Sequence, residues 1–336
     1  MGQGLREDQV AVYKADMYVV ERERATDADP KYPQIYKVID VKSGAGNKTT
    51  QLLGAGRLKR DTTEGEDINF KKPVQGWTTY TNYDNFNAGL VFSKQAIEDT
   101  EKLGNMIKDL AGTWTDYVMI AKEELAARAF NHGGDTSGDY VFLGTFLDEV
   151  DASGLLLYDS KPLFNLTGNT RTTKGGGTYY NSTAGLAVTA DNFETTYNLH
   201  TATNNKGEED EVKTNSADTA ICVPGSDEFL LRRILDTTKG LPGGQLNDKN
   251  VYFNIVDKII AWDYLESTAG WFLGKRNDPN FCFCERQKQE TDFFRDNTNK
   301  SYKASVDARF SLWFKPLAWR TFTRAGGTSV AGGATE

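Results

Sequence analysis

Residues 93–131 read SKQAIEDTEKLGNMIKDLAGTWTDYVMIAKEELAARAFN, and this segment decides how the rest of the chain must fold. Its apolar residues recur every three or four positions, so they form one stripe of a predicted α-helix. We expect Ser93 to cap the helix, and Gly133 or Gly134 to end it in a left-handed turn. At about 1.5 Å per residue the helix would be roughly 50–60 Å long, so other elements must pack along it. The stripe comprises Leu103, Ile107, Leu110, Trp114, Val118, Ala121 and Leu125.

The sequence after this helix predicts both strands and helices. Residues 301–313 alternate between apolar and polar side chains, which predicts a long strand. We expect Trp114 to pack against that strand near Phe310 and Trp313. Further strands are predicted at 219–225, 251–265, 270–275 and 280–287, and helices at 189–203 and from a capping Ser226 onward.

The sequence before the helix predicts an arm and a projecting hairpin. Residues 1–34 mix charged and apolar side chains without a clear period, and we interpret them as an extended arm with at most one short helix. Residues 35–88 contain strand-like pieces on both sides of a polar tip at 59–67. A long isolated hairpin is marginal in water, so we expect it to lie on a neighbouring subunit. The predicted inter-subunit contact residues are Arg57, Lys59, Arg60, Glu64, Glu66, Asp67, Lys71, Lys72 and Trp77.

Composition excludes several classes of protein. The net charge of -8 argues against a protein that grips duplex DNA, because such proteins are usually basic. No run of eighteen apolar residues and no signal peptide is present, so we expect neither a membrane span nor secretion. Three cysteines cannot form a disulfide framework, so we expect buried thiols and folding in a cytosol.

The motifs of common enzymes are absent. SGAGNKTT at 43–50 has the wrong spacing for a phosphate-binding loop and predicts a hairpin turn. The chain has only 2 histidines, few for acid–base or metal chemistry. The neighbouring acids Glu123 and Glu124 fall on a helix face and are interpreted as solvated surface. We therefore predict no enzyme activity, no catalytic residue, no cofactor and no metal site.

Five segments occur in an order that is similar to a known family. They are LVFSKQAIEDT (90–100), LYDSKPLFN (157–165), VTADNFETTYN (188–198), ICVPGSDEFLLRRIL (221–235) and SYKASVDARFSLWFKPLAWR (301–320). Together they resemble the major capsid protein of tailed bacteriophages, of the Hong Kong 97 type, and in particular the Mu-like prophage major head subunit. The resemblance implies an α+β fold that begins with an N-terminal arm at 1–34 and an extended-loop hairpin at 35–88. A peripheral domain at 89–150, with a spine helix at 93–131, and an axial domain at 151–284 would follow. The chain would end with returning peripheral strands at 285–325 and a flexible tail at 326–336.

The resemblance also implies a function. Such proteins assemble as hexamers and pentamers into an icosahedral shell around double-stranded DNA, in the virion, after assembly in the bacterial cytoplasm. Portal, scaffold and decoration proteins are the expected partners besides the chain itself. No cleaved scaffolding segment is recognisable at the start, so we expect a separate scaffold, no scaffold, or a processed form. The alternatives are an encapsulin-type compartment around cargo enzymes and, from another class, a β-rich secreted binding protein or hydrolase.

Overall fold

The computed structural model describes residues 7–27, 29–44, 46–53, 72, 74–93, 103–134, 159, 161–172, 177–183, 185–204, 217–238, 250–266, 270–296, 298 and 301–326. The helices are α1 (Glu7–Asp27), α2 (Tyr32–Ile35), α4 (Leu103–Asn131), α5 (Ala190–Asn204) and α6 (Ser226–Leu235), with 3-10 turns at Thr167–Asn169 and Ala318–Arg320. A four-stranded sheet contains β1 (Lys37–Asp40), β11 (Phe281–Arg295), β12 (Tyr302–Phe314) and β4 (Asp84–Phe92), in that order. A five-stranded sheet contains β7 (Ser182–Thr183), β13 (Phe322–Ala325), β10 (Trp271–Gly274), β8 (Thr219–Cys222) and β9 (Lys258–Ala261), in that order. Two strand pairs complete the fold, β2 (Gly46–Leu53) with β3 (Val74–Asn82) and β5 (Arg171–Thr172) with β6 (Thr178–Tyr179).

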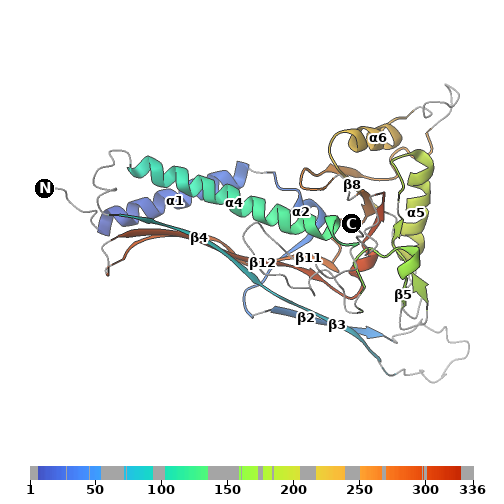
Figure 1. The fold of residues 1–336 in the computed structure, drawn as a ribbon, viewed down its shortest axis with the longest axis horizontal. Helices are drawn as coiled ribbons and strands as arrows, with labels where there is room; N and C mark the ends of the chain where they lie inside the picture. The colour runs from blue at the N-terminus through green and yellow to red at the C-terminus, as the bar shows by residue number, and fades with distance from the viewer. Residues whose placement is uncertain are drawn as a thin grey trace, which may run out of the picture.

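The molecule is elongated, with the two main sheets at different ends (Figure 1). Helices α1 and α4 run side by side along one face of the four-stranded sheet. Helices α5 and α6 belong to the end that holds the five-stranded sheet. Mixed sheets packed with helices confirm the predicted α+β class. The hairpin, the long helix and the returning strand follow one another in the predicted order.

Helix α4 ends at Asn131 as predicted, but for another reason than a left-handed turn. Gly133 and Gly134 are not among the residues with positive φ. A side chain at Gly133 would meet the carbonyl oxygen of Ala129 at 2.1 Å and the ring of Phe164 at 2.7 Å. Position 133 therefore requires glycine, because the helix's own Ala129 carbonyl and the Phe164 ring leave no room for a side chain. The segment around Phe164 crosses the helix end, where the Phe164 amide donates to the Gly133 carbonyl over 2.7 Å. Residues 94–102 lie outside the described part, so capping by Ser93 stays a prediction.

The expectation of an extended N-terminal arm is wrong, because residues 7–27 form helix α1. It lies parallel to α4 and packs through Met17, which is fully buried together with Ile107 and Ala111 of α4. Ion pairs join Asp16 to Lys108 over 3.3 Å and Arg24 to Asp116 over 3.7 Å. The sequence pattern hid this helix, because exposed apolar residues (Val12, Tyr18 and Val19) lie on a different side from the packed ones (Tyr13, Met17 and Val20).

Strand β12 confirms the predicted alternation over most of 301–313, since its residues from Tyr302 to Phe310 are alternately buried and half-buried. The predicted neighbours of Trp114 are wrong. Trp114 packs with Phe293 of β11 and Tyr302 of β12, near the start of β12. Phe310 lies further along, beneath the C-terminal half of α4, and Trp313 points to the opposite face because strand side chains alternate.

The cysteines behave as predicted. All three are free and buried. Cys282 and Cys284 share the face of β11 that is turned away from α4, together with Tyr83 and Trp313.

The hairpin is shorter than the predicted span of 35–88. Strand β1 pairs in parallel with β11, and β4 pairs antiparallel with β12, so both ends of that span belong to the four-stranded sheet. Only β2 and β3 form the separate pair, with a register from Gly46 opposite Asn82 to Leu53 opposite Val74. Residues 54–71, which include the predicted polar tip, lie outside the described part.

The predicted split between axial and peripheral strands differs from the strand pairing in two places. Residues 281–284 begin β11 and so belong to the four-stranded sheet, whereas β13 joins the five-stranded sheet beside β10. Helix α6 is present as predicted, but its N-cap is Gly225 and Ser226 is its first residue. The long strand predicted at 251–265 is reduced to β9, and turns precede it.

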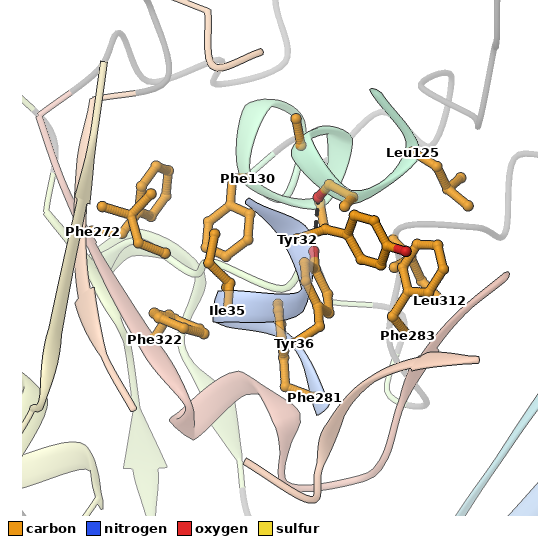
Figure 2. Close-up of a cluster of buried hydrophobic side chains, with 14 of the residues drawn as sticks. Tyr32, Ile35, Tyr36, Leu125, Phe130, Phe272, Phe281, Phe283, Leu312 and Phe322 are labelled. Atoms are coloured by element: carbon orange, nitrogen blue, oxygen red, sulfur yellow. Dashed lines mark hydrogen bonds between the residues drawn. The ribbon is translucent and has the colours of Figure 1, made fainter. Parts of the chain in front are cut away.

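A buried aromatic cluster joins the two sheets at the C-terminal end of α4 (Figure 2). Phe130 of α4 is its centre and makes edge contacts with rings from both sheets. Its ring centroid lies 5.7 Å from that of Phe281 in the first sheet, and 4.9 Å and 5.3 Å from those of Phe272 and Phe322 in the second. Burying rings of this size stabilises the junction by roughly 1.5–3 kcal/mol each, so the two sheets share one core.

Candidate assembly surfaces

The β2–β3 hairpin is attached to the body at its base. Thr81 Oγ donates to the carbonyl oxygen of Leu312 over 2.9 Å, and Asn47 Nδ2 lies 3.5 Å from Cys284 Sγ. Away from the base the two strands hold each other, for example through the hydroxyls of Thr50 and Thr78, 2.9 Å apart. Figure 1 shows the pair running apart from the helices α1 and α4. A two-stranded pair of this kind gains little stability alone.

Only two of the predicted contact residues fall within the described part. Lys72 is exposed, and Trp77 lies half-buried on β3. The other seven lie outside it, so their role stays a prediction: Arg57, Lys59, Arg60, Glu64, Glu66, Asp67 and Lys71.

Glu123 was interpreted from the sequence as solvated surface, and this is wrong. Its side chain is only 6% exposed and accepts three hydrogen bonds. Oε1 accepts from the amides of Lys31 and Tyr32 over 2.5 Å and 3.2 Å, and Oε2 accepts from Trp262 Nε1 over 2.6 Å. Burial raises the pKa of Glu123, and the three donors offset part of that rise. The carboxylate thus connects α4, the segment after α1 and the loop after β9.

A buried ion pair lies next to this carboxylate. Lys122 Nζ is 2.7 Å from Glu285 Oε1 of β11, and both side chains are about one-tenth exposed. The Tyr32 hydroxyl donates to the same Glu285 oxygen over 3.1 Å. Burial and the nearby Glu285 raise the pKa of Tyr32. Lys122 and Glu123, at neighbouring positions of α4, therefore hold the segment after α1, strand β11 and the loop after β9 in place. A sequence signal existed, because Lys122 and Glu123 lie between Ala121 and Leu125 of the predicted apolar stripe.

Exposed apolar side chains gather at three places on the described surface, and Phe294 of β11 is exposed besides them. Near α6 they are Phe229, Leu230, Val251 and Phe253. On α1 they are Val12, Tyr18 and Val19, and beside α4 and β4 they are Met106, Tyr117, Ile120, Leu90 and Val91. Exposed apolar residues that gather in this way are typical of surfaces that contact other molecules.

Neither a metal-binding cluster nor a membrane-spanning helix is found in the part of the chain that the structure describes. No group of three or more His, Cys, Asp or Glu side chains is arranged to hold a metal ion. Across those same residues, no helix is both long and apolar enough to cross a membrane.

No protein-family model and no curated protein matches the chain. Among solved structures it is similar to the "Capsid of native GTA particle", with 12% identity, a TM-score of 0.49, and coverage of 90% of this chain and 91% of that chain. The mature capsid of bacteriophage PhiM1 gives 10% identity, a TM-score of 0.47, and 89% and 87% coverage. A chain from Microbacterium phage Oxtober96 gives 10% identity, a TM-score of 0.45, and 89% and 94% coverage. With TM-scores below 0.5, these likenesses alone assign no function.

Proposed function

We propose that this chain is the major capsid protein of a tailed-phage type of particle. In this proposal it assembles as hexamers and pentamers into an icosahedral shell that encloses double-stranded DNA. The observation that carries the proposal is the β2–β3 hairpin, which is anchored to the body through residues at its base, such as Thr81 and Asn47. Since such a pair is marginal alone, it needs a surface outside its own subunit.

The rest of the subunit suits the same role. A shell needs rigid building blocks, and the Phe130 cluster and the Glu123 carboxylate both connect the two sheets. A hairpin that binds a different surface on the next copy makes a heterologous contact, and repeated heterologous contacts close into rings. The net charge of -8 supports a wall that encloses DNA without gripping it.

The remaining parts of the proposal follow from the resemblance. The chain would be a structural protein and no enzyme, located in the virion and assembled in the host cytoplasm. Portal, scaffold and decoration proteins would be its partners besides other copies of itself.

Deleting residues 62–67, in the polar tip that the sequence predicts, tests this role. We expect circular dichroism and melting temperature to stay close to those of the parent, while rings and shells disappear in electron micrographs. A matched deletion of 207–212, from another polar stretch, should leave assembly intact. A deletion at 62–67 that still assembles, or one that unfolds the subunit, would contradict the proposal.

The contents of the particles separate the proposal from the encapsulin-type alternative. Particles made together with the phage's other proteins should hold nuclease-protected double-stranded DNA. Particles that hold only a protein cargo would favour the alternative.

A further inference from the structure

Helix α1 is held to the rest of the fold by few apolar contacts. It packs against α4 and β11, and Met17 is the one fully buried side chain among those of α1 that the structure describes. Tyr13 and Val20 are half-buried beside it. Trp114 of α4 and Phe293 of β11 share the same cluster, so α4 contacts the sheet without the help of α1. An element with few buried apolar contacts opens more readily than the core around it.

Three ion pairs make up much of the remaining α1 interface. Their side chains are between 36% and 58% exposed. Exposed pairs of this kind stabilise little, because water and salt screen them. They therefore guide α1 to its place without holding it firmly. The pairs are Lys14 with Asp292 of β11 over 2.7 Å, Asp16 with Lys108 of α4 over 3.3 Å, and Arg24 with Asp116 of α4 over 3.7 Å.

Glu21 is an acid on the packed side of α1. It follows Tyr13 and Met17 at intervals of four residues, so it continues their stripe. Its side chain is half-buried, and Thr291 Oγ1 of β11 donates to its Oε2 over 3.1 Å. None of the ion pairs that the described residues of α1 form includes Glu21. The charge that acts on it comes from another acid, Glu290 of β11.

These surroundings favour the protonated form of Glu21 while α1 is docked. Burial raises the pKa of Glu21, the hydrogen bond from Thr291 offsets part of the rise, and the charge of Glu290 adds to it. Proton uptake by Glu21 therefore strengthens docking. This gain is complete below the pKa of Glu21 in a released helix, ordinarily about 4.5, and is lost as the pH rises through the higher docked value. The charged groups that face α1 from its neighbours are Glu290 and Asp292 of β11 and Lys108 and Asp116 of α4.

We propose that α1 is a pH-dependent clasp, which closes over α4 and β11 when Glu21 takes up a proton and opens more readily at neutral pH. Opening uncovers Ile107 and Ala111 of α4 and Phe293 of β11, which are buried in one cluster with Met17. The clasp is thus a cover over an apolar surface, and one carboxyl group sets how firmly it closes. It acts within a single subunit, so it does not depend on the proposed shell.

Hydrogen exchange of the full-length protein at pH 7.5 and pH 5.0 tests the clasp. The readout is the protection factor of the amides of 7–27, which corrects for the pH dependence of intrinsic exchange. We expect this protection to be roughly threefold or more greater at pH 5.0. Glu21→Gln replaces the carboxyl group by a neutral group of the same shape. In that variant α1 should be roughly threefold or more better protected than in the parent at pH 7.5, with no further gain at pH 5.0.

Matched variants separate a titrating carboxyl group from a merely structural one. Glu23→Gln changes an exposed acid of the same helix and should behave like the parent. Thr291→Val removes the hydroxyl that donates to Glu21, so protection of 7–27 should fall at pH 7.5 and rise more steeply toward pH 5.0. The proposal is overturned by equal protection of the parent at the two pH values, by a pH dependence that survives Glu21→Gln, or by the same response in the Glu21→Gln and Glu23→Gln variants.

Discussion

The indole of Trp262 donates a 2.6 Å hydrogen bond to the carboxylate of Glu123, and this bond links the loop after β9 to helix α4. The other oxygen of the same carboxylate holds the amides of Lys31 and Tyr32. One buried side chain therefore fixes the N-terminal segment, the long helix and the second sheet against one another. Such satisfied buried groups specify a single arrangement of the parts.

Glu123→Gln should destabilise the subunit by roughly 1–3 kcal/mol, because an amide presents a donor where three donors already converge. Urea unfolding followed by tryptophan fluorescence measures this change. The matched change Glu124→Gln, at the half-buried next position, should alter the unfolding free energy by less than about 0.5 kcal/mol. Equal effects of the two changes would show that Glu123 is not the connecting group.

Breaking the buried ion pair should cost more than breaking an exposed one on the same helix. Lys122→Met leaves Glu285 buried without its cation, and we expect a loss of about 3–5 kcal/mol. Lys108→Met breaks the more exposed pair with Asp16 and should cost no more than about 1 kcal/mol. Thermal melts of both variants provide the comparison, and a similar small loss in both would contradict the burial of Lys122.

His200 should make the subunit sensitive to acid. Burial lowers the pKa of His200 to about 4, from an ordinary value near 6.5. Its contribution to stability is therefore complete above the unfolded pKa of about 6.5 and is lost as the pH falls from there toward the folded value. The difference in unfolding free energy between the parent and His200→Gln should thus change between pH 7 and pH 4.5. A pH-independent difference for His200 would refute the assignment.

Trp114→Ala should remove the support that α4 gives to the start of β12. Truncating a buried Trp costs about 3–5 kcal/mol, a large part of the roughly 5–15 kcal/mol that holds a domain. The neighbouring Thr113 is exposed, so Thr113→Ala should cost less than about 0.5 kcal/mol. Soluble yield and melting temperature would report both changes, and a Trp114→Ala protein that melts like the parent would place the stripe on the wrong side.

Local patterns predicted the elements that have one buried face. Strand β12 alternates and was predicted, and α4 was predicted from its stripe through its end at Asn131. Helix α1 packs through Tyr13, Met17 and Val20, but it was missed because the exposed Val12, Tyr18 and Val19 obscure that stripe.

Local sequence patterns could not predict which distant segments of the chain pair with each other. Strand β4 looked like part of a hairpin, because nothing in its own sequence indicates that Phe86 stacks on Phe310, 224 residues later. The same limit hid the burial of Glu123, since it depends on which elements lie beside α4. Of the predicted contact residues, Lys72 and Trp77 can be placed, and their contacts with a neighbour remain predictions.

The state of assembly of the purified full-length chain tests the central claim most directly. Sedimentation velocity over a range of salt and protein concentration, with electron micrographs of the same samples, measures it. We expect rings of five or six copies and closed shells with icosahedral symmetry, favoured by higher protein concentration. A single species with the 37.3 kDa mass of one chain under every condition would contradict the account.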